Sequence, residues 1–338
     1  AVQIAAGITP SNATSGFKNE GTINVTGGTT ANGIAGMNVS YGTIKNGTTV
    51  GSTASVTIDN GAGIYGTNGS KLQNYGTITV TGSGAGIAAR GTDKNVKQTY
   101  GTDNVNSGNV IEIENHGTIN VAGNNPVAIY AENNTHAARS RVLVSNDKQL
   151  TVGDDGVGIF ATGSSDSEAA SVHSDINLTG GTINVGNNQA VGVFIADDAT
   201  NPLKTTVTNT GTNMTVGTNA FGYVVDSTTG TDLLLGTATN KLTASLGPDS
   251  VYAYSNDKNG YVYSNTDITT TGGKSYGLYT AGRTENYGNI DLTGGNGNVG
   301  IYSTGRSSAG LGAINYGTIT VGGTDLVAKE YGIGMATG

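Results

Sequence analysis

Aromatic side chains recur at one position of a repeated phrase, where they are well suited to bind a partner. The phrase reads Val/Ala-Gly-Ile-Tyr-Ala. Strand alternation would place its Val, Ile and Ala on one face and its Gly and Tyr on the other. Because the all-apolar set should face inward, we expect the rings to form an outward strip that serves as an interaction surface. The strip comprises Tyr65, Tyr130, Phe160, Phe194, Tyr254, Tyr279 and Tyr302. The alternative is that the parity is reversed, or that an inserted loop covers the strip.

Further partner-binding candidates lie in predicted insertions and at one turn. The insertions span 91–114, 133–149 and 163–177. The first carries Lys94, Lys97 and Tyr100, the second carries the basic residues His136, Arg139 and Arg141, and the third is Ser-rich and acidic. Four tyrosines cluster around the turn Ser255–Gly260, and tyrosine offers a large contact area at low entropic cost. They are Tyr252, Tyr254, Tyr261 and Tyr263.

The residues typical of catalysis and metal binding have structural explanations here. His116 occupies a column that otherwise holds Tyr41, Tyr75, Tyr287 and Tyr316, so we expect it to replace a tyrosine in a stack. His136 and His173 have no obvious second metal ligand. The acidic clusters at 154–155, 197–198 and 166–168 read as solvated turns, with weak calcium binding as the alternative. Two Gly-x-Gly-x-x-Gly matches lack the strand and helix that a dinucleotide site requires. We therefore predict no catalytic, cofactor-binding or metal-binding residue.

The elements that position these residues are set by an internal repeat. A first phrase, Asn-x-Gly-Thr-Ile-x-Val, precedes the aromatic phrase, and the pair recurs about eleven times at intervals of about 23–42 residues. Each phrase has the two-residue period of a half-buried strand, and no sustained helical period occurs. A stack of such units predicts an all-β parallel solenoid of about eleven coils, with two or three short strands per coil.

Two residue columns should hold the coils together. The asparagines tolerate tight corners and can form stacked amide ladders, and the isoleucines should stack inside the solenoid. The asparagine column contains Asn19, Asn74, Asn115, Asn286 and Asn315. The isoleucine column contains Ile23, Ile78, Ile119, Ile183, Ile290 and Ile319.

Composition narrows the functional classes. The 338 residues carry a formal net charge of −8, which disfavours nucleic acid as a partner. Cysteine is absent, so the chain has neither a disulfide framework nor a thiolate metal site. No apolar run reaches the length of a transmembrane helix, and Ala1–Thr9 lacks the charged start of a signal peptide. The last repeat almost touches the end of the sequence, so we expect this chain to be a piece of a longer protein.

The paired phrases resemble the passenger domains of bacterial autotransporter adhesins of type V secretion, and are most similar to the long fusobacterial surface adhesins. The resemblance covers about Asn19 to Met335. It implies a single-stranded right-handed parallel β-helix, exposed on the outer membrane or extracellular, and joined to the membrane only through a barrel outside this sequence. It also implies adhesion to a host-cell or bacterial surface protein or glycan, while self-association is a further expectation. The alternative class is a carbohydrate-active β-helix enzyme, such as a lyase or a tailspike-like glycanase, which would need paired carboxylates on one coil face.

Overall fold

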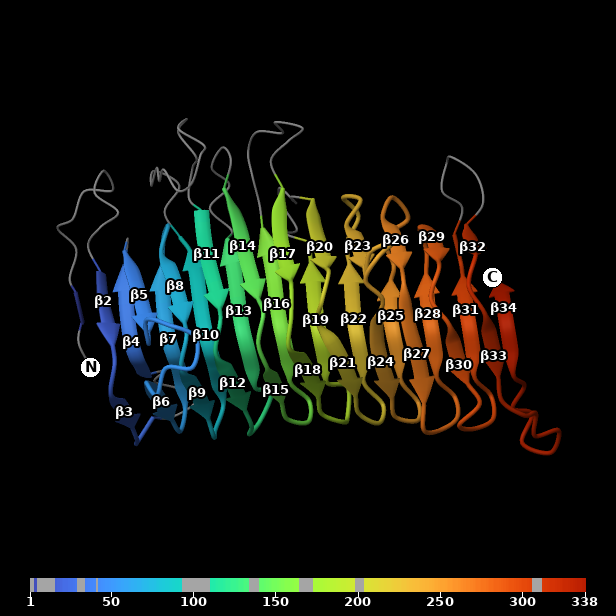
Figure 1. Cartoon of the computed structure of the whole chain (residues 1–338), viewed down its shortest axis with the longest axis horizontal. Helices are drawn as coiled ribbons and strands as arrows, with labels where there is room; N and C mark the ends of the chain where they lie inside the picture. The colour runs from blue at the N-terminus through green and yellow to red at the C-terminus, as the bar shows by residue number, and fades with distance from the viewer. Residues whose placement is uncertain are drawn as a thin grey trace.

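The structure is a computed structural model, and it is a rod built from three parallel sheets that run the length of the chain (Figure 1). It describes residues 3–4, 16–28, 34–40, 42–92, 110–133, 140–163, 173–197, 204–305 and 312–338. The two chain ends lie at opposite ends of the long axis. The described residues contain strands and turns but no helix. The predicted fold class, an all-β parallel β-helix of about eleven coils, is confirmed.

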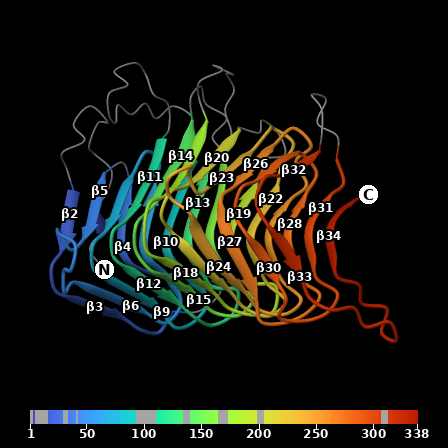
Figure 2. The same cartoon turned by 45° about the vertical axis from the view of Figure 1, so that its right-hand side comes forward.

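Each coil contributes one strand to each sheet in the order A, B, C, and every strand pairs with its equivalent in the next coil. Sheet C lies along the bottom of the rod in Figure 2, below sheets A and B. Sheet A contains β1 (Gln3–Ile4), β4 (Ile34–Ser40), β7 (Gly61–Thr67), β10 (Gly84–Gly91), β13 (Val127–Asn133), β16 (Val157–Gly163), β19 (Val191–Ala196), β22 (Phe221–Asp226), β25 (Val251–Ser255), β28 (Tyr276–Thr280), β31 (Val299–Ser303) and β34 (Ile333–Thr337). Sheet B contains β2 (Gly16–Asn19), β5 (Thr43–Asn46), β8 (Lys71–Asn74), β11 (Val110–Asn115), β14 (Arg141–Asn146), β17 (Ser174–Leu178), β20 (Thr205–Asn209), β23 (Asp232–Leu235), β26 (Tyr261–Ser264), β29 (Arg283–Asn286) and β32 (Ala313–Asn315). Sheet C contains β3 (Thr22–Val25), β6 (Ser55–Ile58), β9 (Thr77–Val80), β12 (Thr118–Val121), β15 (Leu150–Val152), β18 (Thr182–Val185), β21 (Asn213–Val216), β24 (Leu242–Leu246), β27 (Thr266–Thr270), β30 (Ile290–Leu292) and β33 (Ile319–Val321).

The core is a set of stacked aliphatic columns that fill the space between the three sheets. The predicted isoleucine column lies on sheet C, where Ile78 pairs in register with Ile119 and both are fully buried. Ile183 and Ile290 are buried in the same way. Ile23 and Ile319 pack on the core but are only partly covered, because they lie on the two edge strands of the sheet.

The repeated glycine of the aromatic phrase faces the core, which corrects the predicted parity. Neighbouring strands of sheet A pair at Val127 and Val157 and again at Ile129 and Ile159, and skip the residue between. Both strands have one residue there, so the alternation is interrupted at the same point in each: the glycine position and the isoleucine after it both point inward, while Val127 and Val157 before them are partly exposed. Glycine is needed there because a Cβ on Gly63 would lie 2.5 Å from the Cγ2 methyl of Ile78.

The ends of the three predicted insertions belong to the coil. Strand β11 occupies the last residues of the segment 91–114, β14 lies within 133–149, and β17 begins within 163–177. These strands lack the repeated phrases, and their outward residues are mostly polar, as Glu112 and Glu114 are in β11 and Asp175 and Asn177 are in β17. The variable stretches that remain, including 92–109, all connect a strand of sheet A to the next strand of sheet B.

Candidate functional site

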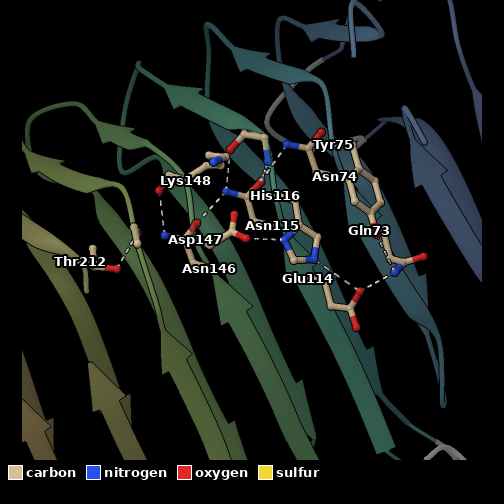
Figure 3. Close-up of polar contacts among 12 residues, drawn as sticks. Gln73, Asn74, Tyr75, Glu114, Asn115, His116, Asn146, Asp147, Lys148 and Thr212 are labelled. Atoms are coloured by element: carbon tan, nitrogen blue, oxygen red, sulfur yellow. Dashed lines mark hydrogen bonds and ion pairs between the residues drawn. The ribbon is translucent and has the colours of Figure 1, made fainter. Parts of the chain in front are cut away.

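A buried asparagine ladder forms the corner between sheets B and C (Figure 3). The Nδ2 of Asn74 donates to the Oδ1 of Asn115 at 2.8 Å, and the Nδ2 of Asn115 donates to the Oδ1 of Asn146 at 2.7 Å. Each amide also donates to a corner carbonyl two residues on, as Asn115 does to Gly117 at 2.9 Å. The predicted amide ladder is therefore confirmed, and it also includes Asn146, which the phrase pattern had missed.

Rings stack outside this ladder, at the residue that follows each asparagine. His116 stacks on Tyr75 with 5.0 Å between ring centroids, and Tyr287 stacks on Tyr316 at 4.6 Å. The Nδ1 of His116 lies 2.8 Å from a carboxylate oxygen of Asp147, which orients the imidazole (Figure 3). The prediction that His116 replaces a tyrosine in a stack is confirmed.

Beside His116, the outer face of sheet B carries a charged cluster that sequence analysis missed. The Nζ of Lys71 lies 2.8 Å from Glu112 and 2.6 Å from Glu114. Gln73 donates to Glu114 as well. Lys71 and the two glutamates are 41 and 43 residues apart in sequence, so only the pairing of β8 with β11 brings them together. The alternation Glu-Ile-Glu-Asn at 112–115 was the one sequence signal of this outer face.

The environment of this cluster separates the acidities of its two carboxyl groups. Burial raises the pKa of Glu112 and outweighs its ion pair with Lys71. Burial also acts to raise the pKa of Glu114, but the hydrogen bonds from Lys71, Gln73 and Glu112 outweigh it, and that pKa is lowered. The two carboxyl groups thus share one ammonium, that of Lys71. This arrangement ties adjacent coils together.

The predicted aromatic strip lies on the outer face of sheet A, and its rings are partly exposed. Tyr130 stacks on Phe160 at 5.0 Å, and Phe160 meets the edge of Phe194 at 5.6 Å. Further along, Tyr279 lies 5.2 Å from Tyr254 and 4.8 Å from Tyr302. The predicted outward direction of the rings is confirmed, so this strip is a regular surface of stacked rings along the rod.

Two ring positions of the strip between Tyr65 and Tyr302 hold an aliphatic residue, Val224 and Ala88, and their surroundings differ. Beside Val224, the ring of Phe221 from the same strand contacts Tyr254, with 6.4 Å between the ring centroids. At Ala88, a groove of about 620 Å³ opens on the face of the sheet. Its lining includes Tyr65, Ala85, Ala88, Val127 and Tyr130.

The tyrosines around the turn Ser255–Gly260 do not form one surface. Tyr252 is only 1% exposed, so its predicted partner contact is wrong. It occupies the inward glycine position of β25, with its ring against Tyr223 at 5.5 Å and its hydroxyl 3.2 Å from that of Thr266. Tyr254 belongs to the strip on sheet A, whereas Tyr261 and Tyr263 face outward from sheet B, at partly exposed positions.

The remaining predicted contacts fall into two groups. Lys94, Lys97, Tyr100, His136 and Arg139 lie outside the described residues, as do Asp166, Glu168 and Asp198. The acidic turns that are described bind the backbone of the following coil: Asp154 accepts from the backbone N–H of Asn187 at 2.8 Å, and Asp197 accepts from the backbone N–H of Thr228 at 2.6 Å.

No group of three or more His, Asp or Glu side chains within the described ranges is placed to hold a metal ion. The same part of the chain has no helix that is long and apolar enough to span a bilayer. Comparison with protein-family models, with curated proteins and with solved structures found no match. The functional argument therefore depends on the surfaces of the rod.

Proposed function

We propose that this chain is a non-enzymatic adhesin or structural rod of a bacterial cell surface. It would bind a protein or glycan on a host cell or another bacterium through the outer face of sheet A, without a cofactor and without nucleic acid as a partner. The observation that carries the proposal is the strip of partly exposed rings on that face, from Tyr65 to Tyr302.

The strip supports binding because the core of the rod does not contain it. The inward columns of all three sheets are mostly aliphatic and buried. Ring-to-ring contacts along the strip add about 0.5–1.5 kcal/mol each, which stabilises the coils but does not require exposure. Aromatic residues are also enriched at the centres of protein interfaces, where they supply large contact areas.

The test removes two adjacent rings from the strip. We expect the double variant Phe160→Ser and Phe194→Ser to fold, since both side chains point away from the core, and to lose adhesion to cells or self-association. Binding of purified rods to cells and sedimentation velocity measure the two effects. Tyr287→Ser is the matched control, because it removes an exposed ring from the corner between sheets B and C and leaves sheet A intact.

A second arm tests the longest connection between sheets A and B. Deleting residues 93–109 leaves β10 and β11 complete, so the coil should still close. Loss of adhesion in this variant alone would move the binding site from the strip to the connection. Unchanged adhesion and association in both variants would contradict the proposal for this chain and leave it the role of a stalk.

The alternative is a carbohydrate-active enzyme, and Glu112 and Glu114 are the carboxylates that come nearest to its requirements. Glycosidases hold their two carboxyl groups about 5–9.5 Å apart, with room for water or substrate between them. Glu112 and Glu114 instead both accept from the ammonium of Lys71, and Gln73 also donates to Glu114, so their oxygens are engaged by protein side chains. This geometry favours the binding proposal. Polysaccharide cleavage by the parent rod that is lost in Glu112→Gln would reverse that preference.

A further inference from the structure

The groove at Ala88 has the geometry of one missing ring. Ala88 pairs in register with Tyr65 on one side and with Tyr130 on the other, so it occupies a ring position of the strip. Parallel strands lie about 4.8 Å apart, which places Tyr65 and Tyr130 about 9.6 Å apart. A flat ring midway between them would lie about 4.8 Å from each. The stacked pairs of the same strip have centroid distances of 4.8 and 5.0 Å.

The floor of this slot is apolar, and its edges are polar. The methyl groups of Ala85 and Ala88 line the floor. Beyond them the Nε of Arg90 donates to Glu132 at 2.7 Å, and the hydroxyl of Tyr130 donates to the same carboxylate at 2.7 Å. The side chain of Arg90 is 52% exposed, and a guanidinium carries several N–H donors. Ser83 and Asn125, which precede β10 and β13, also line the groove, so a ring in the slot would have methyl groups beneath it and polar groups at both ends.

The second gap in the strip shows how the chain completes a missing ring. Val224 stands between Phe194 and Tyr254, and the ring of Phe221 from the same strand covers the space beside Tyr254. At Ala88 the equivalent neighbour is Ala85, which has no ring to supply. The slot thus remains an opening with two aromatic walls.

We propose that this slot binds an aromatic side chain, best a tyrosine, presented by a partner polypeptide. Its ring would stack between Tyr65 and Tyr130, and its hydroxyl would reach the Arg90–Glu132 edge, as the hydroxyl of Tyr130 does. A sugar ring fits less well, because its hydroxyl groups surround the ring and several would face the methyl groups of Ala85 and Ala88 without partners. This inference rests on the proposed function and identifies one contact of the binding face.

The probe is a fluorescein-labelled Gly-Ser peptide with one central tyrosine, and a sister peptide carries leucine in its place. Fluorescence anisotropy measures binding of each peptide to the rod. Stacking on two walls predicts that the tyrosine peptide binds at least about tenfold more tightly than the leucine peptide.

Ala88→Phe tests the slot by filling it with a ring of the chain's own. We expect this variant to lose the tyrosine preference while its melting temperature stays the same or rises, because the added ring completes the strip. Val191→Phe is the control, since it adds a ring to the same sheet face three coils from Ala88 and should bind like the parent.

Equal binding of the two peptides, no binding of either, or unchanged binding by Ala88→Phe would each overturn the proposal. A panel of methyl glycosides provides a further arm. Glycoside binding that is lost in Ala88→Phe, in the absence of a tyrosine preference, would assign the slot to a sugar instead. Failure here is separable from failure of the adhesion proposal, because the Phe160 and Phe194 variants leave the slot residues unchanged.

Discussion

Replacing Asn115 by Asp tests whether the amide ladder holds the coils together. The substitution is nearly isosteric, but it exchanges the Nδ2 donor for an oxygen. The Oδ1 of Asn146 at 2.7 Å and the carbonyl of Gly117 at 2.9 Å then lose their donor. Asn115 and Asn146 are both fully buried, so water cannot replace the lost bonds without opening the corner.

The magnitude follows from those two acceptors. An unsatisfied buried polar group costs about 1–3 kcal/mol, so the pair predicts a loss of about 2–6 kcal/mol. The new charge adds to this cost, because it is buried and has Glu114 and Asp147 near it. For a urea dependence of about 1–3 kcal/mol/M, the unfolding midpoint at pH 7 should fall by about 1 M or more.

The stability lost in Asn115→Asp should grow as pH rises, which a purely steric defect would not produce. Burial and the facing acceptors raise the folded-state pKa of the introduced carboxyl above its unfolded value of about 3.9. The folded state then binds more protons than the unfolded state, so stability falls as pH rises through the folded pKa. Below about pH 4 the carboxyl is protonated, and its O–H restores one of the two hydrogen bonds.

Urea unfolding at pH 4 and pH 7 measures both the stability loss at pH 7 and its dependence on pH. Asn120→Asp is the matched control, since it makes the same chemical change on the outer face of β12. Amide exchange should show loss of protection first in β11, β12 and β14, because a solenoid is stabilised mainly by neighbouring coils. The reasoning fails if Asn115→Asp unfolds like Asn120→Asp at pH 7, or if it gains stability relative to the parent between pH 4 and pH 7.

Three further predictions concern the core. Ser264→Asn should raise stability by about 1 kcal/mol in urea unfolding. The hydroxyl of Ser264 and the Oδ1 of Asn286 are buried without partners, and the substitution removes that hydroxyl and supplies an Nδ2 that can donate to the Oδ1 of Asn286. An unchanged or lower urea midpoint would contradict this. Ile119→Asp should cost several kcal/mol, since it places an unpaired charge at a fully buried position, and an unchanged melting temperature would show that the column is not core. Burial raises the pKa of Tyr223 to about 12, so the folded state keeps its proton to higher pH than the unfolded state, and stability should fall by about 2 kcal/mol as pH rises from 10 to 12. Tyr223→Phe should weaken that alkaline loss, and an identical pH profile would disprove the assignment.

The sequence by itself determined the repeat, the strand type and two of the columns. Asn74, Asn115 and Asn315 recur in phase with Ile78, Ile119 and Ile319, and both periods are local properties that a single strand and its corner impose. Such in-phase residues have to stack when the units stack, so the ladder and the isoleucine column were predictable. The outward aromatic strip followed from the same alternation.

Only the tertiary structure decided how the coils meet. The interruption of the alternation in sheet A occurs in register in neighbouring strands, so a simple alternation could not place Gly63 and Tyr252 inward. Lys71 meets Glu112 because β11 pairs with β8, although the two side chains are 41 residues apart in sequence. The slot at Ala88 likewise exists because the strand register places this small residue between Tyr65 and Tyr130. Contacts across coils are fixed by pairing between strands that are distant in sequence, and local periodicity carries no information on that pairing.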